Sequence, residues 1–364
     1  MSLKCGIVGL PNVGKSTLFN ALSNGGAESA NFPFCTIDPN VGQVSIPDAR
    51  LLNLARIAKS ASVIPTAIEF VDIAGLVAGA AEGKGKGNAF LSNIRETDLI
   101  IHVVRCFIDD DIIHVEGDVD PERDIAIIES ELILKDLESV EKRVETLKKQ
   151  SKSGDKVFKA QLDVVDRLRT HLEDGNTART FEVSEDDKAA YRDLFLLSAK
   201  PVLYACNVGE SDLENGNELV ETVKKVAAKF GDEVVMFCAK IEAEIAELDE
   251  DEKEMFLEEL GVSSAGLDRL IHAAYAELGL ITYFTVGPKE ARAWTIKKGT
   301  KAPQAAGVIH TDFEKGFIRA ETIAYDHFIE YNGEKGAKEA GKMRQEGKEY
   351  IVSDGDTMLF RFNV

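Results

Sequence analysis

The stretch Gly9-Leu10-Pro11-Asn12-Val13-Gly14-Lys15-Ser16 follows the apolar run Cys5 to Val8 and precedes a helical pattern that begins at Thr17. Its spacing is G-x-x-x-x-G-K-S. Between a strand and a helix, such a loop directs backbone N–H groups at a phosphate chain, and the helix N-terminus adds unpaired amides and a positive dipole. We expect Lys15 to reach the β- and γ-phosphates and Ser16 to bind Mg²⁺. The stretch therefore predicts a nucleotide-phosphate site.

Further apolar runs predict the sheet that carries this loop. Each run is continuous rather than alternating, which is typical of strands that are covered on both faces of a parallel α/β sheet. The runs are Ile68–Val71, Leu99–Val104, Val202–Cys206 and Val234–Phe237. Ligands on such sheets bind at the carboxyl ends of the strands, and the motifs below all follow a predicted strand.

The second motif is Asp72-Ile73-Ala74-Gly75, which follows the run Ile68–Val71. Asp72 can hold Mg²⁺ through water, and the amide of Gly75 can meet a γ-phosphate. The next residue is Leu76, where many GTPases have a glutamine that orients the attacking water. His114 is a candidate for that task, although a lone histidine is more often structural.

Two further loops stand where small GTPases read the base. They are Asn207-Val208-Gly209-Glu210 and Cys238-Ala239-Lys240, in place of N-K-x-D and S-A-K. The aspartate of N-K-x-D accepts two hydrogen bonds from guanine, whereas Glu210 is one methylene longer and Val208 replaces the lysine. We therefore expect a pocket that tolerates or prefers adenine, with Asn207 and the backbone of Val208 as contacts. The alternative is an ordinary GTPase with a variant loop.

The rest of the chain predicts two additions to this α/β domain. Residues between Asp120 and about Phe195 contain two apolar stripes at helical spacing, joined by a polar turn at 151–155, and predict an antiparallel helical hairpin. The hairpin is either a solvated arm or an arm that docks a partner. From Ile281 onward, short β-like runs, Gly307–Ile309 among them, and glycine-rich turns predict a small α+β domain. The acidic stretch Ala243–Leu260 reads as a solvated helix.

Composition limits the alternatives. The 364 residues carry a net charge of −20, which argues against nonspecific adhesion to nucleic acid or to anionic membranes. Residues 281–364 contain 13 Lys+Arg and 12 Asp+Glu, so this segment is the part least repelled by a polyanion. The five cysteines form no C-x-x-C pair, and no apolar run is long enough for a membrane helix. We expect a cytoplasmic protein with no membrane contact.

These motifs, together with a long C-terminal run, make the whole chain resemble the YchF/Obg-like ATPase family. The run reads Arg292-Ala293-Trp294-Thr295-Ile296-Lys297-Lys298-Gly299-Thr300-Lys301-Ala302-Pro303-Gln304-Ala305-Ala306-Gly307 and continues through His310-Thr311-Asp312-Phe313-Glu314-Lys315-Gly316-Phe317. The resemblance implies a P-loop G domain of the Obg type at 1–125 and 196–280, a helical coiled-coil insertion at 126–195 and a TGS domain at 281–364.

The resemblance also implies site residues and partners. The family's motif places the nucleotide phosphates on Asn12, Val13, Gly14, Lys15, Ser16 and Thr17. It places Mg²⁺ on Ser16 and Thr36, and the base at Val208. Members hydrolyse ATP in preference to GTP and associate with ribosomes, through the large subunit or the whole particle. A cleft between arm and TGS domain is a proposed RNA-binding surface in such proteins, and here its basic residues are either an RNA contact or ordinary solvated side chains (Lys289, Arg292, Lys297, Lys298 and Lys301).

Three functions fit the sequence. The leading hypothesis is a regulatory ATPase that uses Mg²⁺ and associates with the ribosome, with catalysis by Lys15 and the loop amides and His114 as the candidate water-positioning residue. The second is a GTP-hydrolysing ribosome-assembly factor. The third is a nucleotide-gated adaptor with negligible turnover.

Overall fold

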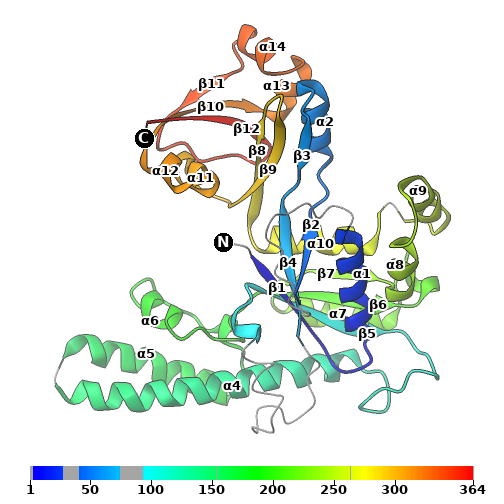
Figure 1. Cartoon of the computed structure of the whole chain (residues 1–364). Coiled ribbons are helices and arrows are strands. Elements are labelled where there is room, and N and C mark those ends of the chain that lie inside the picture. Colours follow the sequence, from blue (N-terminus) through cyan, green and yellow to red (C-terminus); the bar gives the residue numbers. More distant parts are fainter. Residues whose placement is uncertain (1–2, 28–40, 74–92, 154, 263, 364) are drawn as a thin grey trace. The chain divides into compact units, whose positions relative to one another are not determined.

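The chain divides into two compact units, and each unit is built from two separate stretches of the sequence. The computed structural model describes residues 3–27, 41–73, 93–153, 155–262 and 264–363. The N-terminal unit contains Met1–Val44 and Glu69–Ala274, and the C-terminal unit contains Ser45–Ile68 and Tyr275–Val364 (Figure 1). The division differs from the expected one in two places: the C-terminal unit begins at Tyr275 rather than at residue 281, and it also contains the segment 45–68.

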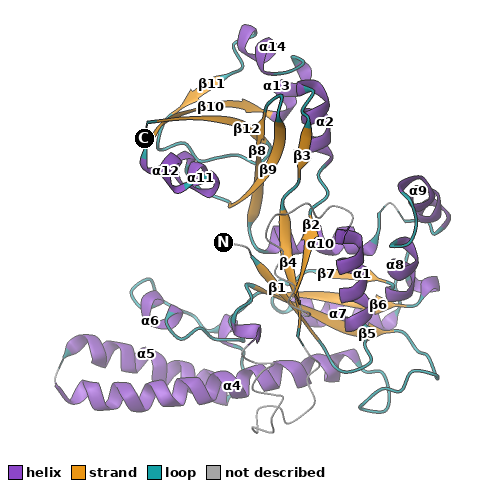
Figure 2. Ribbon diagram, in the orientation of Figure 1, coloured by secondary structure: helices purple, strands orange, loops and turns teal. Residues whose placement is uncertain are grey.

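The N-terminal unit is built on a six-stranded sheet with the strand order β2-β4-β1-β5-β6-β7 (Figure 2). β1 is parallel to β4 and to β5, and parallel pairing continues from β5 through β6 to β7. All residues of β5 and β6 are buried, which explains their continuous apolar sequences. The strands are β1 (Lys4–Val8), β2 (Val41–Ser45), β4 (Ala67–Asp72), β5 (Leu99–Cys106), β6 (Val202–Val208) and β7 (Val234–Phe237). The predicted α/β P-loop fold is confirmed.

Helices alternate with these strands. α1 contacts α8, and α4 contacts α7 as well as β5. The helices of this part of the chain, apart from the hairpin, are α1 (Lys15–Ala27), α6 (Lys188–Arg192), α7 (Glu218–Ala228), α8 (Ala239–Ile245), α9 (Glu250–Glu259) and α10 (Gly266–Glu277). The acidic stretch is thus two helices rather than one, because Asp249 and Glu252 form a capping box that starts α9 anew.

A helical hairpin leaves the sheet after β5. It consists of α4 (Pro121–Gln150), which Asp120 caps, and α5 (Lys156–Glu173), which Asp155 caps. The predicted apolar stripes meet along the hairpin, and its buried core contains Ile133, Val140, Val144, Leu147, Val165, Leu168 and Leu172. Beyond the part of α4 that contacts α7 and β5, the two helices rely on this shared seam to bury their apolar faces.

The C-terminal unit contains a mixed sheet with the order β11-β10-β12-β8-β9-β3. β3 comes from the segment 45–68 and pairs in parallel with β9. The remaining neighbours are antiparallel except β12 and β8. The strands are β3 (Ser62–Ile64), β8 (Leu280–Val286), β9 (Glu290–Lys297), β10 (Phe317–Ala324), β11 (Arg344–Glu346) and β12 (Asp356–Phe362), and the helices are α2 (Ala49–Ala58), α11 (Ala302–Ile309), α12 (Thr311–Lys315), α13 (Tyr325–Glu330) and α14 (Glu334–Glu339).

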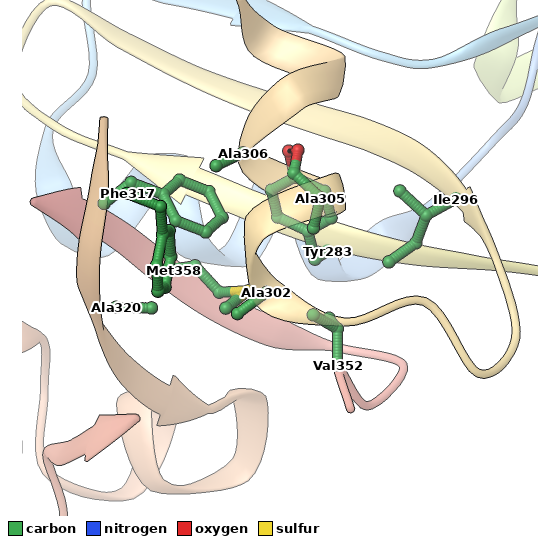
Figure 3. Close-up of a cluster of buried hydrophobic side chains, with 10 residues drawn as sticks. Tyr283, Ile296, Ala302, Ala305, Ala306, Phe317, Ala320, Val352 and Met358 are labelled. Carbon is green, nitrogen blue, oxygen red and sulfur yellow. Dashed lines mark hydrogen bonds between the residues drawn. The ribbon is translucent and has the colours of Figure 1, made fainter. Parts of the chain in front are cut away.

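Neighbouring residues of β8 belong to different cores, which shows that both faces of this sheet are covered. Tyr283 lies in a cluster with Ala302, Ala305 and Ala306 of α11 (Figure 3). Phe284, one residue later, lies in a second cluster with residues of α2, α13 and α14. Successive side chains of a strand point to opposite faces, so α11 covers one face and α2 helps to cover the other.

Two expectations for this unit were wrong. The run Gly307–Ile309, taken as β-like, is the last turn of α11, whose small buried alanines let the helix lie close to the sheet. The segment 45–68, assigned to the G domain, supplies β3 and α2, and Arg50 of α2 forms an ion pair with Asp354 at 2.6 Å. Neither the pairing of β3 with β9 nor the ion pair of Arg50 with Asp354 has a local signature in the sequence.

No helix among the described residues combines the length and the hydropathy that a bilayer crossing requires. Cys5, Cys106, Cys206 and Cys238 are buried free thiols, and Cys35 lies outside the described residues.

Asp136 of α4 fixes the hairpin to the segment before β6. Its carboxylate is fully buried and accepts from the backbone N–H of Leu197 and of Ser198, each at 2.7 Å, and from the Ser198 hydroxyl at 2.6 Å. We predict that Asp136→Ala lowers the free energy of unfolding by about 2–4 kcal/mol, because it leaves buried donors without an acceptor. Urea denaturation measures this loss. Asp163→Ala, on the exposed surface of α5, is the matched control and should change stability by less than about 0.5 kcal/mol; equal losses in the two variants would contradict the prediction.

Candidate functional site

The loop between β1 and α1 has the backbone geometry that its sequence requires. Gly9 has a φ of +152°, and a Cβ there would lie 2.5 Å from the carbonyl oxygen of Val103. Gly14 has a φ of +99°, and a Cβ there would lie 2.3 Å from Nδ2 of Asn207. Only glycine is free of both restrictions at these positions. The loop can therefore approach β5 and β6 closely.

Lys15 is held at the first residue of α1. Its side chain is 7% exposed, and Nζ donates to the carbonyl oxygen of Leu10 at 2.6 Å. Burial lowers the pKa of Lys15 to about 8, and the negative charge of Asp72 acts in the opposite direction. A buried ammonium whose partner is a neutral carbonyl gains strongly from an arriving anion, since the anion replaces the hydration that the group has lost.

Asp72 ends β4 as predicted. Burial raises the pKa of its carboxyl group, and the charge of Lys15 opposes that rise. Its Oδ1 is buried and has no hydrogen-bond partner among the described residues. An orphaned carboxylate oxygen beside a phosphate loop is the kind of group that coordinates a divalent cation, directly or through water. Thr36, Gly75 and Leu76, which the sequence analysis also singled out, lie outside the described residues.

Asn207 joins three parts of the site. At the end of β6, its Nδ2 donates to the carbonyl oxygen of Val13 at 3.0 Å, and its Oδ1 accepts from the backbone N–H of Ala239 at 3.0 Å. The side chain is 4% exposed. Its amide thus fixes the phosphate loop and the start of α8 to the sheet, and these bonds take up the amide groups that we had expected to contact the base.

A cavity of about 900 Å³ lies where these loops meet. It brings together the predicted residues Asn12, Gly14, Lys15, Ser16, Thr17, Asn207, Val208 and Glu210. Val13 is buried and is not among the described residues that line the cavity, and its carbonyl group accepts the hydrogen bond from Asn207. The two loops predicted to read the base both contribute, because Cys238, Ala239 and Lys240 also line the cavity. The volume is ample for a nucleotide.

Sequence reasoning missed one wall of this cavity. Phe107, Asp109 and Ile112, which follow β5, line it, as do Ala243, Glu244 and Glu247 of α8 and the residues after it. The α8 residues were interpreted as a solvated surface. The 107–112 loop was noticed only because it leads to His114, since single apolar residues such as Phe107 and Ile112 beside a run of aspartates carry no local sign of a ligand.

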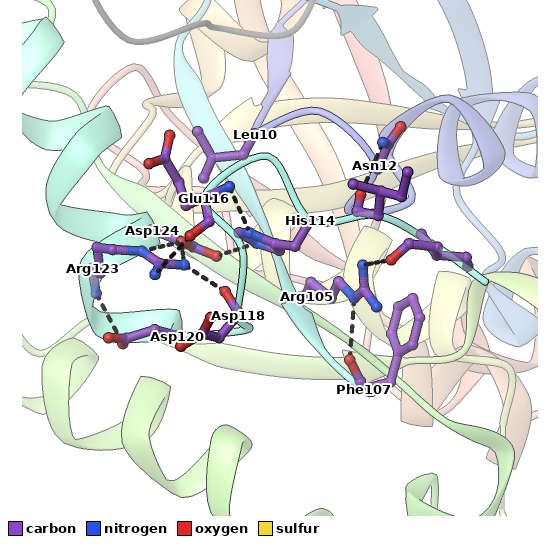
Figure 4. Close-up of polar contacts among 12 residues, drawn as sticks. Leu10, Asn12, Arg105, Phe107, His114, Glu116, Asp118, Asp120, Arg123 and Asp124 are labelled. Carbon is purple, nitrogen blue, oxygen red and sulfur yellow. Dashed lines mark hydrogen bonds and ion pairs between the residues drawn. The ribbon is translucent and has the colours of Figure 1, made fainter. Parts of the chain in front are cut away.

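His114 lies beyond this wall and is not among the described residues that line the cavity. It is buried, its Nε2 lies 2.8 Å from Oδ2 of Asp124, and its Nδ1 accepts from the backbone N–H of Glu116 at 3.2 Å (Figure 4). Arg123 binds the other oxygen of Asp124 at 2.9 Å. With both ring nitrogens bonded, His114 anchors the loop to α4 in this arrangement. A catalytic role therefore requires the loop to release the ring, and stays a prediction.

Comparison with known proteins gives the family. Two family models match: "50S ribosome-binding GTPase" over residues 4–150 and the YchF GTPase C-terminal model, "Protein of unknown function (DUF933)", over residues 280–363. The chain is 57% identical over 364 residues to the "Ribosome-binding ATPase YchF" of Escherichia coli O157:H7, and each chain is covered completely. This chain belongs to the YchF/Obg-like ATPase family. It is therefore a P-loop nucleoside triphosphatase.

Other members of the YchF/Obg-like ATPase family agree over the full length. The "Obg-like ATPase 1" of Pongo abelii is 48% identical over 369 residues, which cover 100% of this chain and 93% of that protein. The solved structure of the Schizosaccharomyces pombe YchF GTPase is 41% identical, has a TM-score of 0.89 and covers 99% of this chain and 98% of its own. The likeness thus includes both units. The E. coli and Pongo abelii proteins are named ATPases, whereas the Schizosaccharomyces pombe protein is named a GTPase.

The pKa of Lys15 predicts how nucleotide affinity depends on pH. In the free protein the ammonium loses its proton as pH rises through about 8. We predict that the affinity for a nucleoside triphosphate falls above this value, by up to about tenfold per pH unit, because the charge that meets the phosphates is lost. Calorimetric titration between pH 7 and 9.5 measures this. Lys15→Arg keeps its charge over this range and should give a flat profile; a flat wild-type profile would contradict the prediction.

The same shift affects stability with a defined sign. The pKa of Lys15 is lower in the folded protein than the usual 10.5, so between about pH 8 and 10.5 the unfolded chain binds more protons at this residue. The contribution of Lys15 to the stability of the free protein therefore rises with pH in that window. Nucleotide affinity and this contribution change in opposite directions.

Proposed function

We propose that this protein hydrolyses ATP in preference to GTP, uses Mg²⁺, and changes its association with the ribosome according to the bound nucleotide. Two readings compete with this one: a GTP-hydrolysing ribosome-assembly factor, and a nucleotide-gated adaptor with negligible turnover. The choice of base by the Asn207–Glu210 loop distinguishes the GTPase from our proposal. The rate of hydrolysis distinguishes the adaptor from it.

The observation that carries the proposal is the state of the Asn207–Glu210 loop. The amide of Asn207 is engaged with Val13 and Ala239, and the side chain of Val208 is 2% exposed. Glu210 is exposed and lines the cavity, but its carboxylate is one methylene further from the backbone than that of an aspartate. Backbone N–H and C=O groups then remain as the nearby partners of the base, and together they match the N1 acceptor and the amino donor of adenine.

The residues also fit Mg²⁺. The side chain of Ser16 lines the cavity, and Asp72 offers a buried oxygen without a partner among the described residues. Ser16 would bind the cation directly and Asp72 directly or through water, and the family resemblance adds Thr36. When bound, Mg²⁺ neutralises charge on the phosphates. Lys15 and the amides of the 9–16 loop hold the phosphate chain and stabilise the charge that moves to it during hydrolysis.

Competition between the two purine triphosphates tests the proposal. We expect ATP to displace a bound fluorescent nucleotide at lower concentration than GTP, and Lys15→Ala to abolish hydrolysis because the phosphates lose their cation. Glu210→Asp should shift the ratio of affinities toward GTP by about tenfold or more, since it shortens the side chain toward the position that accepts from guanine.

The control for Glu210→Asp is Glu214→Asp, an exposed residue after the same strand that does not line the cavity. It should leave the ratio unchanged. Tighter binding of GTP than of ATP by the wild-type protein would favour the GTPase reading. Binding of ATP without hydrolysis, with or without ribosomes, would favour the adaptor.

Ribosome association rests on the relatives. The E. coli protein is named a ribosome-binding ATPase, and the model that matches residues 4–150 is described as a 50S ribosome-binding GTPase. We propose that this chain does the same, in the cytoplasm, through the large subunit or the whole particle. We also propose the domain names that the resemblance implies, G domain, helical insertion and TGS domain, with 45–68 now assigned to the last. An RNA contact of the arm and the TGS domain stays a prediction.

Sedimentation with purified ribosomes tests this association. We predict that the bound fraction differs at least about threefold between ADP and a non-hydrolysable ATP analogue, because the γ-phosphate orders switch segments in P-loop proteins. Lys15→Ala should lose this difference. Equal sedimentation of the wild-type protein in both nucleotide states would contradict a nucleotide-controlled association, and separated subunits show which particle binds.

A further inference from the structure

Arg105, near the end of β5, is a buried cation that the nucleotide chemistry above does not use. Its side chain is 2% exposed and is one of the largest fully buried side chains. Among the described residues its guanidinium donates to backbone carbonyl oxygens: Nε to Phe107 at 3.1 Å, Nη1 to Ile112 at 2.8 Å and Nη2 to Asp109 at 3.1 Å. It also lies 4.6 Å from the centre of the Phe107 ring (Figure 4).

This arrangement is costly and specific. A buried charge loses its hydration, and neutral carbonyl groups compensate for that loss only when several converge on it. The planar guanidinium spreads its donors in a fixed fork, so the carbonyl groups of Phe107, Asp109 and Ile112 must take one relative arrangement. The shape of the 107–112 loop is therefore set by Arg105.

The residues whose carbonyl groups Arg105 holds are the ones that form the unpredicted wall. Phe107, Asp109 and Ile112 line the nucleotide cavity. The loop is also tied to the phosphate loop, because Nδ2 of Asn12 donates to the carbonyl oxygen of Ile113 at 3.1 Å. Arg105 pairs in register with Asn207 on the neighbouring strand. Near the ends of two adjacent strands, Arg105 of β5 and Asn207 of β6 thus each fix a different loop that borders the cavity.

We propose that Arg105 is a positioning residue for nucleotide binding. It fixes the 107–112 loop so that Phe107 and Ile112 present an apolar wall to the nucleoside, while Lys15 and Ser16 hold the phosphates at the other part of the cavity. Apolar side chains suit a planar base and offer nothing to a phosphate. The inference rests on the proposed function, since it assumes that the cavity binds a nucleotide. It assigns Arg105 to affinity and not to the hydrolytic step.

The affinity of Arg105→Gln for ATP and for ADP tests this assignment. Loss of a preorganised wall should raise both dissociation constants by a similar factor, about tenfold or more, because the nucleoside is common to both ligands. At saturating ATP and Mg²⁺, kcat should stay within about twofold of the wild-type value, because a change in KM alone marks an interaction shared by ground and transition states. A merely structural role would lower the melting temperature and leave the dissociation constants of the folded protein unchanged.

Arg179→Gln is the matched control. Arg179 also lies over a phenylalanine, 4.2 Å from the ring centre of Phe230, and is largely buried, but it binds Asp232 and Glu129 and does not line the cavity. It should lose stability without loss of affinity. Arg105→Lys keeps the charge but cannot match the fork, so it should bind several-fold more weakly than wild type; it decides the question if Arg105→Gln does not fold.

The outcomes separate this inference from the proposed function. Wild-type binding of ATP together with unchanged dissociation constants in Arg105→Gln, or in Arg105→Lys where the first variant does not fold, would overturn the inference alone. A fall in kcat without weaker binding would also overturn it. A wild-type protein that bound neither ATP nor ADP would overturn both.

Discussion

The nucleotide cavity depends on one side-chain amide. Asn207 bonds the phosphate loop through Val13 and the start of α8 through Ala239, and Gly14 lies so close to it that any side chain there would collide. This bridge adds directed hydrogen bonds to the packing of α1 against α8, which alone would fix the loop after β1 less closely. An asparagine can join two loops in this way because its side-chain amide carries a donor and an acceptor at a fixed separation.

Charged groups around the cavity are held in conditions that favour an anionic, metal-bound ligand. Lys15 is buried against a neutral carbonyl group, Asp72 keeps a buried oxygen without a partner among the described residues, and each affects the pKa of the other. In the free protein these groups are poorly solvated. A phosphate chain with its cation would supply the missing partners, so part of the binding energy is prepared by the fold before the ligand arrives.

The sequence predicted the parts of this site that have local signatures, and missed those created by tertiary contact. The G-x-x-x-x-G-K-S stretch and the Asn207–Glu210 loop meet at one cavity, and Asp72 ends β4, because all three stand at the ends of strands of the parallel sheet; their roles stay predictions. The wall formed by Phe107 and Ile112 was missed, since its shape comes from Arg105. The sequence does not show which backbone carbonyl groups an arginine within an apolar strand will bind. The helix α11 was partly read as strand because its alanines and Gly307 carry little helical amphipathicity. The placement of β3 could not be predicted, because its partner β9 lies far away in the sequence.

The order of the segments along the chain has a consequence for folding on the ribosome that makes this protein. Ser45–Ile68 leaves the exit tunnel early, but the strand and core that cover it come from Tyr275–Val364. At common elongation rates the wait for that partner is roughly 10 to 40 seconds. During this time α2 has an apolar face with no cover of its own and β3 has no neighbour. The residues from Tyr275 onward, expressed alone, would lack the part of their core that α2 supplies.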